Sequence, residues 1–345
     1  MSTKVGSGPS SVKWTGRLFF LLVSATFCIG FLSGCVIQSP NPFNKFSTPL
    51  KEFALYGSGP EKILVISIKG VISDTGKDAL FISEPSMVQE VVSQLRKAER
   101  DKKVRAVILK VDSPGGTTTA SDILYNELLN FKKRTGIKII VMMMGMATSG
   151  GYYVSLPADY IMAHPTTVTG SVGVIFMRPL AYELMDKIGV SVDIVKSGSK
   201  KDMGTPFRLP TQEEKDIFQQ VTSDLGKRFL SLVQIHRQLS EEAKQEVASA
   251  RIFLAEEAKE LGLVDQIGYL ADAVSQARLL ADLPFNAKIV VYRRSPHYND
   301  NLYNTATSKL PSEGVSLINV DFLNELKHLE TGFFYLWAPG TGVTD

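Results

Sequence analysis

Residues 138–153 of this 345-residue chain read KIIVMMMGMATSGGYY. The apolar run from Lys138 to Met144 is typical of a fully buried β-strand, and the small residues after it predict a tight turn into a helix. Ser149 stands directly before two glycines, which leave its hydroxyl open to approach. An ordinary strand-to-helix loop and a serine nucleophile both fit this pattern. Taken alone, the four residues TSGG favour the ordinary loop, so the choice depends on the rest of the chain.

A second strand-like run also ends in a glycine turn. Residues 104–110 precede the sequence VDSPGG, residues 111–116, and an amphipathic helix is expected directly after it. Backbone amides at such a turn stabilise the negative charge of a tetrahedral intermediate, and losing one such donor lowers the rate about 100–1000-fold. We expect the amides of Gly115 and Gly150 to form this oxyanion hole. A Pro-Gly-Gly turn that serves backbone geometry alone is the alternative.

A serine nucleophile needs a base, and the four histidines offer no convincing triad: His164, His236, His297 and His328. Lysine is therefore the candidate. Lys200 and Lys201 lie in a polar loop, residues 197–208, after a strand expected over Val190 to Val195. A lysine acts as a base only when it is neutral, so its pKa must fall by several units from about 10.4. Desolvation and a neighbouring cation both lower it.

Five segments, in this order, resemble the SppA-type signal peptide peptidases, which are serine proteases of the Clp protease/crotonase fold. The resemblance covers about residues 60–275, and the segments are residues 112–116 (DSPGG), 148–153 (TSGGYY), 169–175 (TGSVGVI), 197–208 and 258–265. It implies that Ser149 is the nucleophile and that Lys201, directly before Asp202, is the general base. Lys200 is the alternative base.

The resemblance also implies an assembly. In rings of this family the serine and the lysine of one active site come from adjacent subunits, so a homo-oligomeric ring is expected and a monomer would be inactive. Chains of this length resemble one repeat of the longer family members. The chain departs from the family at two glycines, which appear here as Ala250 and Ala255, and this departure affects the expected loop geometry rather than the dyad.

Strand-like and helix-like segments alternate along the chain, which predicts an α/β fold, and the resemblance implies repeated ββα units of the Clp protease/crotonase type. Strands are expected over residues 63–71, 104–111, 137–143 and 159–163, with helices over 86–99, 120–133 and from 150. A long helix over Gln212 to Arg237 opens with a capping box of Thr211 and Glu214. Its apolar stripe is expected to face the core or a subunit interface: Phe218, Val221, Leu225, Phe229 and Leu232.

The first 34 residues have the pattern of an export signal. Three basic residues, Lys4, Lys13 and Arg17, precede a charge-free stretch over residues 18–32 that is short for a stable membrane span. The sequence LSGC at residues 32–35 resembles the lipobox of bacterial lipoproteins, which implies cleavage before Cys35 and a lipid on that cysteine. An uncleaved signal anchor is the alternative.

Both alternatives place the catalytic domain on the extracytoplasmic side of a bacterial cell membrane. A tether is expected over residues 35–57, a protease domain over 58–285 and a partly irregular C-terminal extension over 286–345. Near the end, residues 333–337 read FFYLW and are apolar enough to dock on a neighbour or on a membrane surface. The sequence does not choose between these two.

Charge and composition argue against several functions. The basic residues of the export segment account for the whole formal net charge of +3, so nothing electrostatic indicates nucleic acid. Cys28 and Cys35 are the only cysteines, so the globular domain has no disulfide. The scarcity of histidine argues against a zinc site, and residues 114–116 lack the lysine and serine of a phosphate loop. No cofactor or metal is expected.

The sequence thus predicts a membrane-tethered Ser/Lys endopeptidase that degrades released signal peptides and other extended, apolar peptides. One alternative is an acyl-CoA hydratase/isomerase-like enzyme on the same scaffold, although an export signal makes cytoplasmic CoA an awkward substrate. The other is a non-catalytic crotonase-fold lipoprotein scaffold. Retention of both Ser149 and Lys201 counts against a scaffold.

Overall fold

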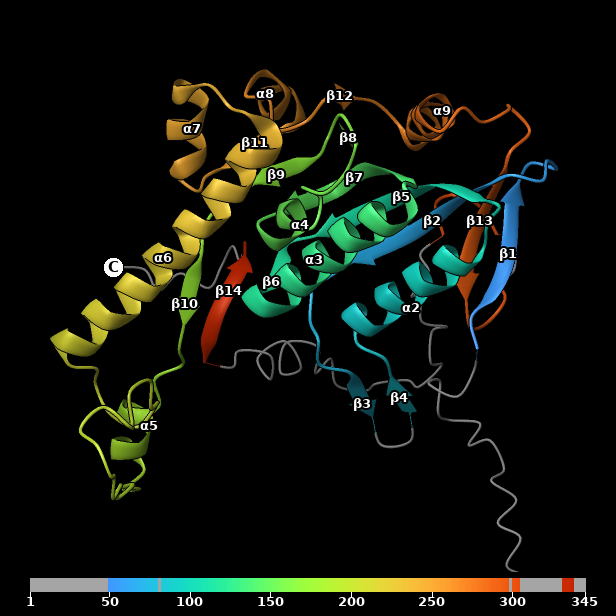
Figure 1. The fold of residues 1–345 in the computed structure, drawn as a ribbon. Coiled ribbons are helices and arrows are strands. Elements are labelled where there is room, and N and C mark those ends of the chain that lie inside the picture. Colours follow the sequence, from blue (N-terminus) through green and yellow to red (C-terminus); the bar gives the residue numbers. More distant parts are fainter. Residues whose placement is uncertain (1–48, 80–81, 298–299, 305–330, 338–345) are drawn as a thin grey trace, which may run out of the picture. The chain divides into compact units, whose positions relative to one another are not determined.

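The computed structural model describes residues 49–79, 82–297, 300–304 and 331–337 (Figure 1). All of them belong to one unit, Phe43–Asp345. The expected export signal, the acylation site Cys35 and His328 lie outside the described residues.

A largely parallel sheet of nine strands forms the centre of the described part of the chain. Its main path runs in the order β1-β13-β2-β5-β7-β8-β12, while β9 continues from the end of β7 and pairs with β11. Only the pairs β1–β13 and β9–β11 are antiparallel. The strands are β1 (Lys51–Tyr56), β2 (Lys62–Lys69), β5 (Val104–Ser113), β7 (Lys138–Thr148), β8 (Tyr160–Ala163), β9 (Val168–Gly170), β11 (Ile252–Leu254), β12 (Gln266–Ile267) and β13 (Lys288–Arg293).

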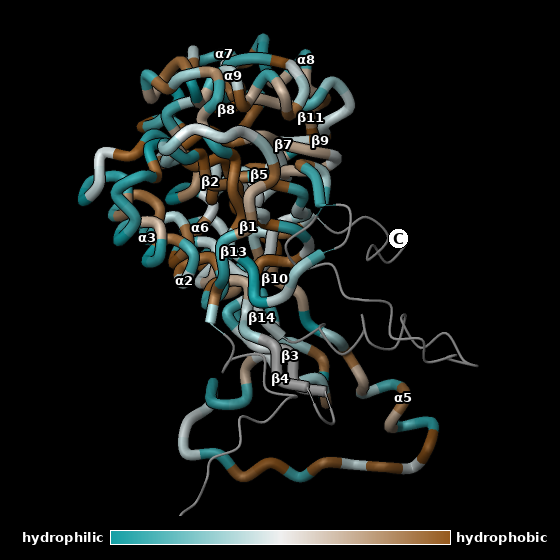
Figure 2. The backbone as a smooth tube through the Cα atoms, turned by 90° about the vertical axis from the view of Figure 1, so that its right-hand side faces the viewer, coloured by the Kyte–Doolittle hydropathy of each residue, from teal (hydrophilic) through white to brown (hydrophobic). Residues whose placement is uncertain are grey.

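Helices cover both faces of this sheet. On one face, α2 (Met87–Arg100) and α3 (Thr118–Thr135) lie side by side, and α9 (Leu270–Leu280) packs on the other (Figure 1). Successive residues of a strand point to opposite faces, so the buried strands need apolar residues throughout. In β7, Val141 belongs to the core under α2 and α3, whereas Met142 belongs to the core under α9. Figure 2 shows the resulting hydrophobic centre along β2 and β5.

A second sheet has three antiparallel strands in the order β10-β14-β6. These strands are β6 (Gly115–Thr117), β10 (Ile175–Met177) and β14 (Gly332–Leu336). The remaining elements are β3 (Lys77–Ala79), β4 (Ile82–Glu84), α4 (Gly150–Tyr153), α5 (Tyr182–Lys187), α6 (Gln212–Arg237), α7 (Glu241–Ala248) and α8 (Ala255–Glu260). The apolar run near the C-terminus, for which the sequence left two docking sites open, thus docks on its own chain as β14.

The sequence predicted this α/β architecture and most of its elements. Helix α6 has the expected bounds and capping box, with Thr211 Oγ1 accepting from the Glu214 amide and Glu214 accepting from the Thr211 amide. In its apolar stripe, Phe229 is fully buried, whereas Val221 keeps 39% of its surface exposed. The C-terminal half of the stripe therefore reaches the core, whereas Val221, nearer the start of the helix, stays partly exposed.

The expected strand over Val190 to Val195 was wrong. No strand forms there, and every residue of this segment is exposed, with Val195 at 95%. Figure 2 shows these hydrophobic residues in the segment that follows α5. Alternating β-branched residues favour a strand only where a ladder partner and a covered face are available, and the described residues provide neither.

The sheet also extends beyond both boundaries expected for the protease domain. β1 falls within the expected tether and β13 within the expected C-terminal extension, yet the two strands pair with each other and β13 pairs with β2. The boundaries at residues 57 and 286 therefore cut through one sheet. The Ser/Pro/Asn-rich composition near β1 favoured a tether and did not predict this short strand, whose side chains are only partly buried.

Ala250, one of the two departures from the family's glycines, adopts a left-handed backbone with a φ of +59°. An L-residue in this region is disfavoured by about 1–2 kcal/mol relative to its ordinary conformations, and glycine is not. We predict that Ala250→Gly raises the free energy of unfolding by up to about 1 kcal/mol, measured by chemical denaturation.

Ala255→Gly is the matched control. Ala255 is fully buried at the start of α8 and is absent from the positive-φ residues, so the same change there should destabilise the fold by about 1 kcal/mol. Equal destabilisation at both positions would contradict the assignment of strain to Ala250.

Candidate active site

The register of β5 against β7 brings the two glycine turns together. The strands are parallel, and Ser113 near the end of β5 lies opposite Ala147 near the end of β7. Carboxyl ends of parallel strands meet at one edge of a sheet, so the residues that follow them become neighbours. Gly115 and Gly150 therefore lie close together at this edge.

Ser149 occupies a strained position between β7 and α4. Its φ is +51° and its ψ is −112°, outside the regions that non-glycine residues favour, at a cost of about 1–3 kcal/mol. The Ser149 amide donates to Gly170 O at 2.8 Å, which ties this backbone to β9. The residue is 1% exposed, and its Oγ contacts Gly173 O at 3.5 Å. Strain of this kind at a strand-to-helix turn is typical of a positioned nucleophile.

Gly115 and Gly150 lie so close that neither position has room for a side chain. A β-carbon on Gly115 would lie 2.8 Å from the Gly150 amide nitrogen, and one on Gly150 would lie 2.6 Å from Ser121 Oγ. In the structure, however, the Gly115 amide donates to Ser113 Oγ at 3.1 Å. To act as an oxyanion donor, this amide must exchange that bond for the substrate.

Two of the three described histidines, His164 and His236, make their polar contacts away from Ser149. His164 Nδ1 contacts Thr166 Oγ1 at 2.9 Å, and His236 Nε2 contacts the Tyr125 hydroxyl at 2.9 Å. Burial lowers the pKa of His236, with Lys132 and Arg237 adding to the effect. Neither ring is placed to take a proton from the serine.

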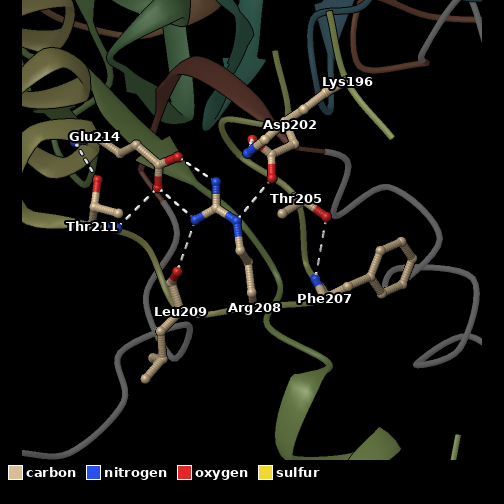
Figure 3. A network of polar contacts seen from close by, with 8 residues as sticks. All are labelled: Lys196, Asp202, Thr205, Phe207, Arg208, Leu209, Thr211 and Glu214. Carbon is tan, nitrogen blue, oxygen red and sulfur yellow. Dashed lines mark hydrogen bonds and ion pairs between the residues drawn. The ribbon is translucent and has the colours of Figure 1, made fainter. Parts of the chain in front are cut away.

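The loop that carries the candidate lysines is held by a network of charged side chains (Figure 3). Asp202 accepts from Lys196 Nζ at 2.7 Å and from Arg208 Nε at 2.9 Å, and Arg208 Nη1 donates to Glu214 Oε2 at 3.0 Å. The hydrogen bonds from Arg208 and Lys196 hold the pKa of Asp202 well below its usual range. Arg208 thus ties the loop to the first turn of α6.

The two lysines differ in their surroundings. Lys200 forms an ion pair with Glu213, whereas the exposed side chain of Lys201 has no hydrogen bond or ion pair to any described residue. The contacts of Ser149 Oγ likewise include neither lysine. The structure of the single chain therefore brings Ser149, Gly115 and Gly150 together, and no hydrogen bond joins Lys201 to them.

Three further residues near Ser149 had not been expected. Ser113 Oγ bridges the Gly115 amide and Gly70 O, Ser121 Oγ borders Gly150, and Tyr335 O lies against both glycines. The serines give no distinct signal in the sequence. Tyr335 belongs to the apolar run at residues 333–337, which was visible but could not be placed.

Comparison with known proteins identifies the family. The sequence profile of Peptidase family S49 matches residues 131–284, and that of Clp protease matches residues 81–168. A protein of Enterococcus faecium named "Putative signal peptide peptidase SppA" is 38% identical over 237 residues, which cover 69% of this chain and 68% of that protein. The chain belongs to peptidase family S49. It is thus a serine peptidase of this family, with a Clp protease-like fold.

Two other relatives differ from the S49 chain in length or in sequence. Protease 4 of Haemophilus influenzae is 37% identical over 242 residues, which cover 70% of the chain but only 38% of that protein. A solved structure of 1510-N, a membrane-bound stomatin-specific protease in complex with a substrate peptide, has a TM-score of 0.41 and 16% identity, covering 70% of this chain and 96% of that one. Within the described ranges of the S49 chain, none of the helices has the length and hydropathy needed to cross a bilayer.

The Arg208 network generates a prediction about the order of the lysine loop. Arg208→Lys keeps the charge but loses the planar fork that joins Asp202 to Glu214, because an ammonium group is a single point charge. We expect faster amide hydrogen exchange over residues 196–209, with the far-UV circular dichroism unchanged. Arg228→Lys, at an exposed pair with Asp122, is the control and should leave exchange in this loop unaltered. Equal exchange in the parent and Arg208→Lys would contradict the role given to Arg208.

Proposed function

We propose that this S49 chain is a Ser/Lys endopeptidase in which Ser149 is the nucleophile and Lys201 the general base. The observation that carries the proposal is the strained, buried backbone of Ser149 directly beside the close pair Gly115 and Gly150. Such a site supports acyl transfer because a serine held in place lies next to backbone amides that can bind an oxyanion.

In the proposed reaction, neutral Lys201 accepts the proton of Ser149 Oγ, and this oxygen attacks the carbonyl carbon of a peptide bond. The Gly150 amide, joined by that of Gly115 once it leaves Ser113 Oγ, holds the negative oxygen of the intermediate. The carbon–nitrogen bond then breaks, and the leaving amine takes the proton from Lys201. Water attacks the resulting ester, with Lys201 again as base, which releases the acid and restores Ser149.

Lys201 is proposed to serve the Ser149 of an adjacent subunit in a homo-oligomeric ring. Its exposed side chain would become desolvated at such an interface, and desolvation favours the neutral amine that a base requires. The neighbouring segment supports this assembly, because Val190, Val192 and Val195 expose 50%, 46% and 95% of their surface to solvent in the isolated protomer. A second copy would cover them.

The substrates are proposed to be extended, largely apolar peptides such as released signal peptides, and the name of the Enterococcus faecium relative supports this class. A lipid on Cys35, or alternatively an uncleaved signal anchor, is proposed to hold the protease domain at the extracytoplasmic side of the bacterial cell membrane.

We predict that Ser149→Ala and Lys201→Ala each reduce peptide cleavage by at least about 1000-fold, because each removes one partner of the proton transfer. Lys200→Ala is the matched control and should keep activity within about twofold of the parent, since Lys200 is paired with Glu213. Cleavage of casein and labelling by a serine-directed phosphonate probe are the measurements.

Labelling or cleavage that persists in Ser149→Ala would contradict the assignment of Ser149 as the nucleophile. Loss of activity in Lys200→Ala, with Lys201→Ala active, would move the base to Lys200. A parent that is inactive in its assembled form would favour the scaffold alternative, and turnover of an acyl-CoA that survives both dyad substitutions would favour the hydratase alternative.

A mixing experiment tests the shared active site. When inactive Ser149→Ala and Lys201→Ala subunits are unfolded, mixed in equal amounts and reassembled, random assembly should give roughly a quarter of the parent activity, since some interfaces combine an intact serine with an intact lysine. The same treatment of each variant alone is the control. If the mixture stays as inactive as its components while the parent survives the treatment, the dyad is formed within one protomer.

A further inference from the structure

Strand β14 lies between two strands that flank the candidate nucleophile. On one side β6 begins with the two glycines of the DSPGG sequence, and on the other β10 follows Gly173, the residue whose carbonyl contacts Ser149 Oγ. Phe334 is paired with Ile175 of β10 and with Thr117 of β6. The three-stranded sheet is thus completed by a segment that comes from the C-terminal end of the chain.

The pairing has the form by which proteases and other peptide-binding proteins hold an extended ligand. An added strand satisfies the exposed backbone groups of a sheet edge, while its alternate side chains enter pockets. Strands in a sheet are about 4.8 Å apart, so β6 and β10 leave a gap one strand wide that β14 fills. Residues 305–330 separate the described segment 331–337 from the described residues before it, so β14 is remote in sequence from both strands that it pairs with.

The backbone of β14 lies beside the candidate active site. A β-carbon on Gly115 would lie 1.9 Å from Tyr335 O, and one on Gly150 would lie 3.0 Å from the same oxygen. Leu336 is paired with Gly115, and the Trp337 amide donates to Pro114 O at 2.9 Å. A peptide carbonyl of the chain itself therefore occupies the space beside the two proposed oxyanion glycines.

The side chains of β14 occupy aromatic pockets on one side of the strand. The Tyr335 ring is 2% exposed and lies 4.8 Å from the Tyr153 ring and 5.0 Å from the Phe229 ring, measured between centroids. Two residues earlier, the Phe333 ring lies 4.9 Å from that of Phe176. The pocket around Tyr335 is built directly on α4, which begins one residue after Ser149.

We propose that residues 332–336 are an internal peptide ligand that fills the substrate groove of this protease. The inference rests on the proposed function and deepens it in two ways. The groove between β6 and β10 takes an extended peptide with aromatic side chains at the positions of Tyr335 and Phe333, and the chain itself blocks this groove until β14 leaves. An external peptide must therefore compete with a segment tethered at about millimolar effective concentration.

The test measures how fast Ser149 is labelled by a phosphonate probe that carries a phenylalanine side chain. In the full chain, Tyr335→Asp places a carboxylate in the buried aromatic pocket and should displace β14, so labelling should accelerate on the order of tenfold. Thr331→Asp adds the same charge to an exposed residue just outside the strand and should label at the parent rate. Addition of the peptide TGFFYLW, residues 331–337, should slow the labelling of Tyr335→Asp again.

Labelling of Tyr335→Asp at or below the parent rate, in a chain with parent-like circular dichroism, would overturn the proposal and make β14 a permanent strand. If Tyr335→Asp fails to fold, hydrogen exchange on full-length Ser149→Ala decides. Saturating TGFFYLW should then accelerate exchange over residues 332–336, and unchanged protection would overturn the proposal. Labelling that persists in Ser149→Ala would instead refute the proposed nucleophile, so the two failures are distinguishable.

Discussion

The parallel pairing of β5 with β7 is the constraint on which the candidate site depends. It sets Ser113 opposite Ala147, so both strands end at the same edge and their following turns collide unless the residues there are small. Gly115 and Gly150 resolve the collision, because a β-carbon on either would overlap neighbouring backbone or side-chain atoms. The same closeness places backbone amides beside Ser149. At this edge, the packing of the two turns and the proposed catalytic geometry thus require the same two glycines. A substitution at either glycine would disturb both.

The strain at Ser149 is held by the rigid sheet beneath it. β7 is buried on both faces, with Val141 under α2 and α3 and Met142 under α9, so its end has little freedom to relax. Backbone bonds fix the turn from the far side, since Ser149 donates to Gly170 O and the end of β7 pairs with β9. A positive φ at a serine persists where the surroundings determine the backbone this completely.

The sequence predicted the features whose causes are local. Only a few adjacent residues determine the apolar run of β7, the glycine turns and the capping box of α6. The structure has these features where they were expected. Features that depend on distant partners were missed. β1 and β13 each needed the other to be recognised, and Val190 to Val195 has a strand pattern without a described partner. Tyr335 was recognised as apolar, but no local signal connects it with Gly115.

The proposed base, Lys201, is a further residue whose role depends on a partner distant from it. Its neighbours are organised within the chain, since Arg208 joins Asp202 to Glu214 and Lys200 is paired with Glu213, but the Lys201 amine forms no hydrogen bond or ion pair with the described residues. In the proposed assembly, this exposed amine would meet its partner in an adjacent subunit. With β14 in the groove as well, the proposed active site lacks both a base and an open binding strand in the isolated chain. Assembly would supply the first and departure of β14 the second. Helix α6 contacts both parts of the site: its first turn meets the lysine loop through Glu214, and Leu225 and Phe229 further along meet Tyr335.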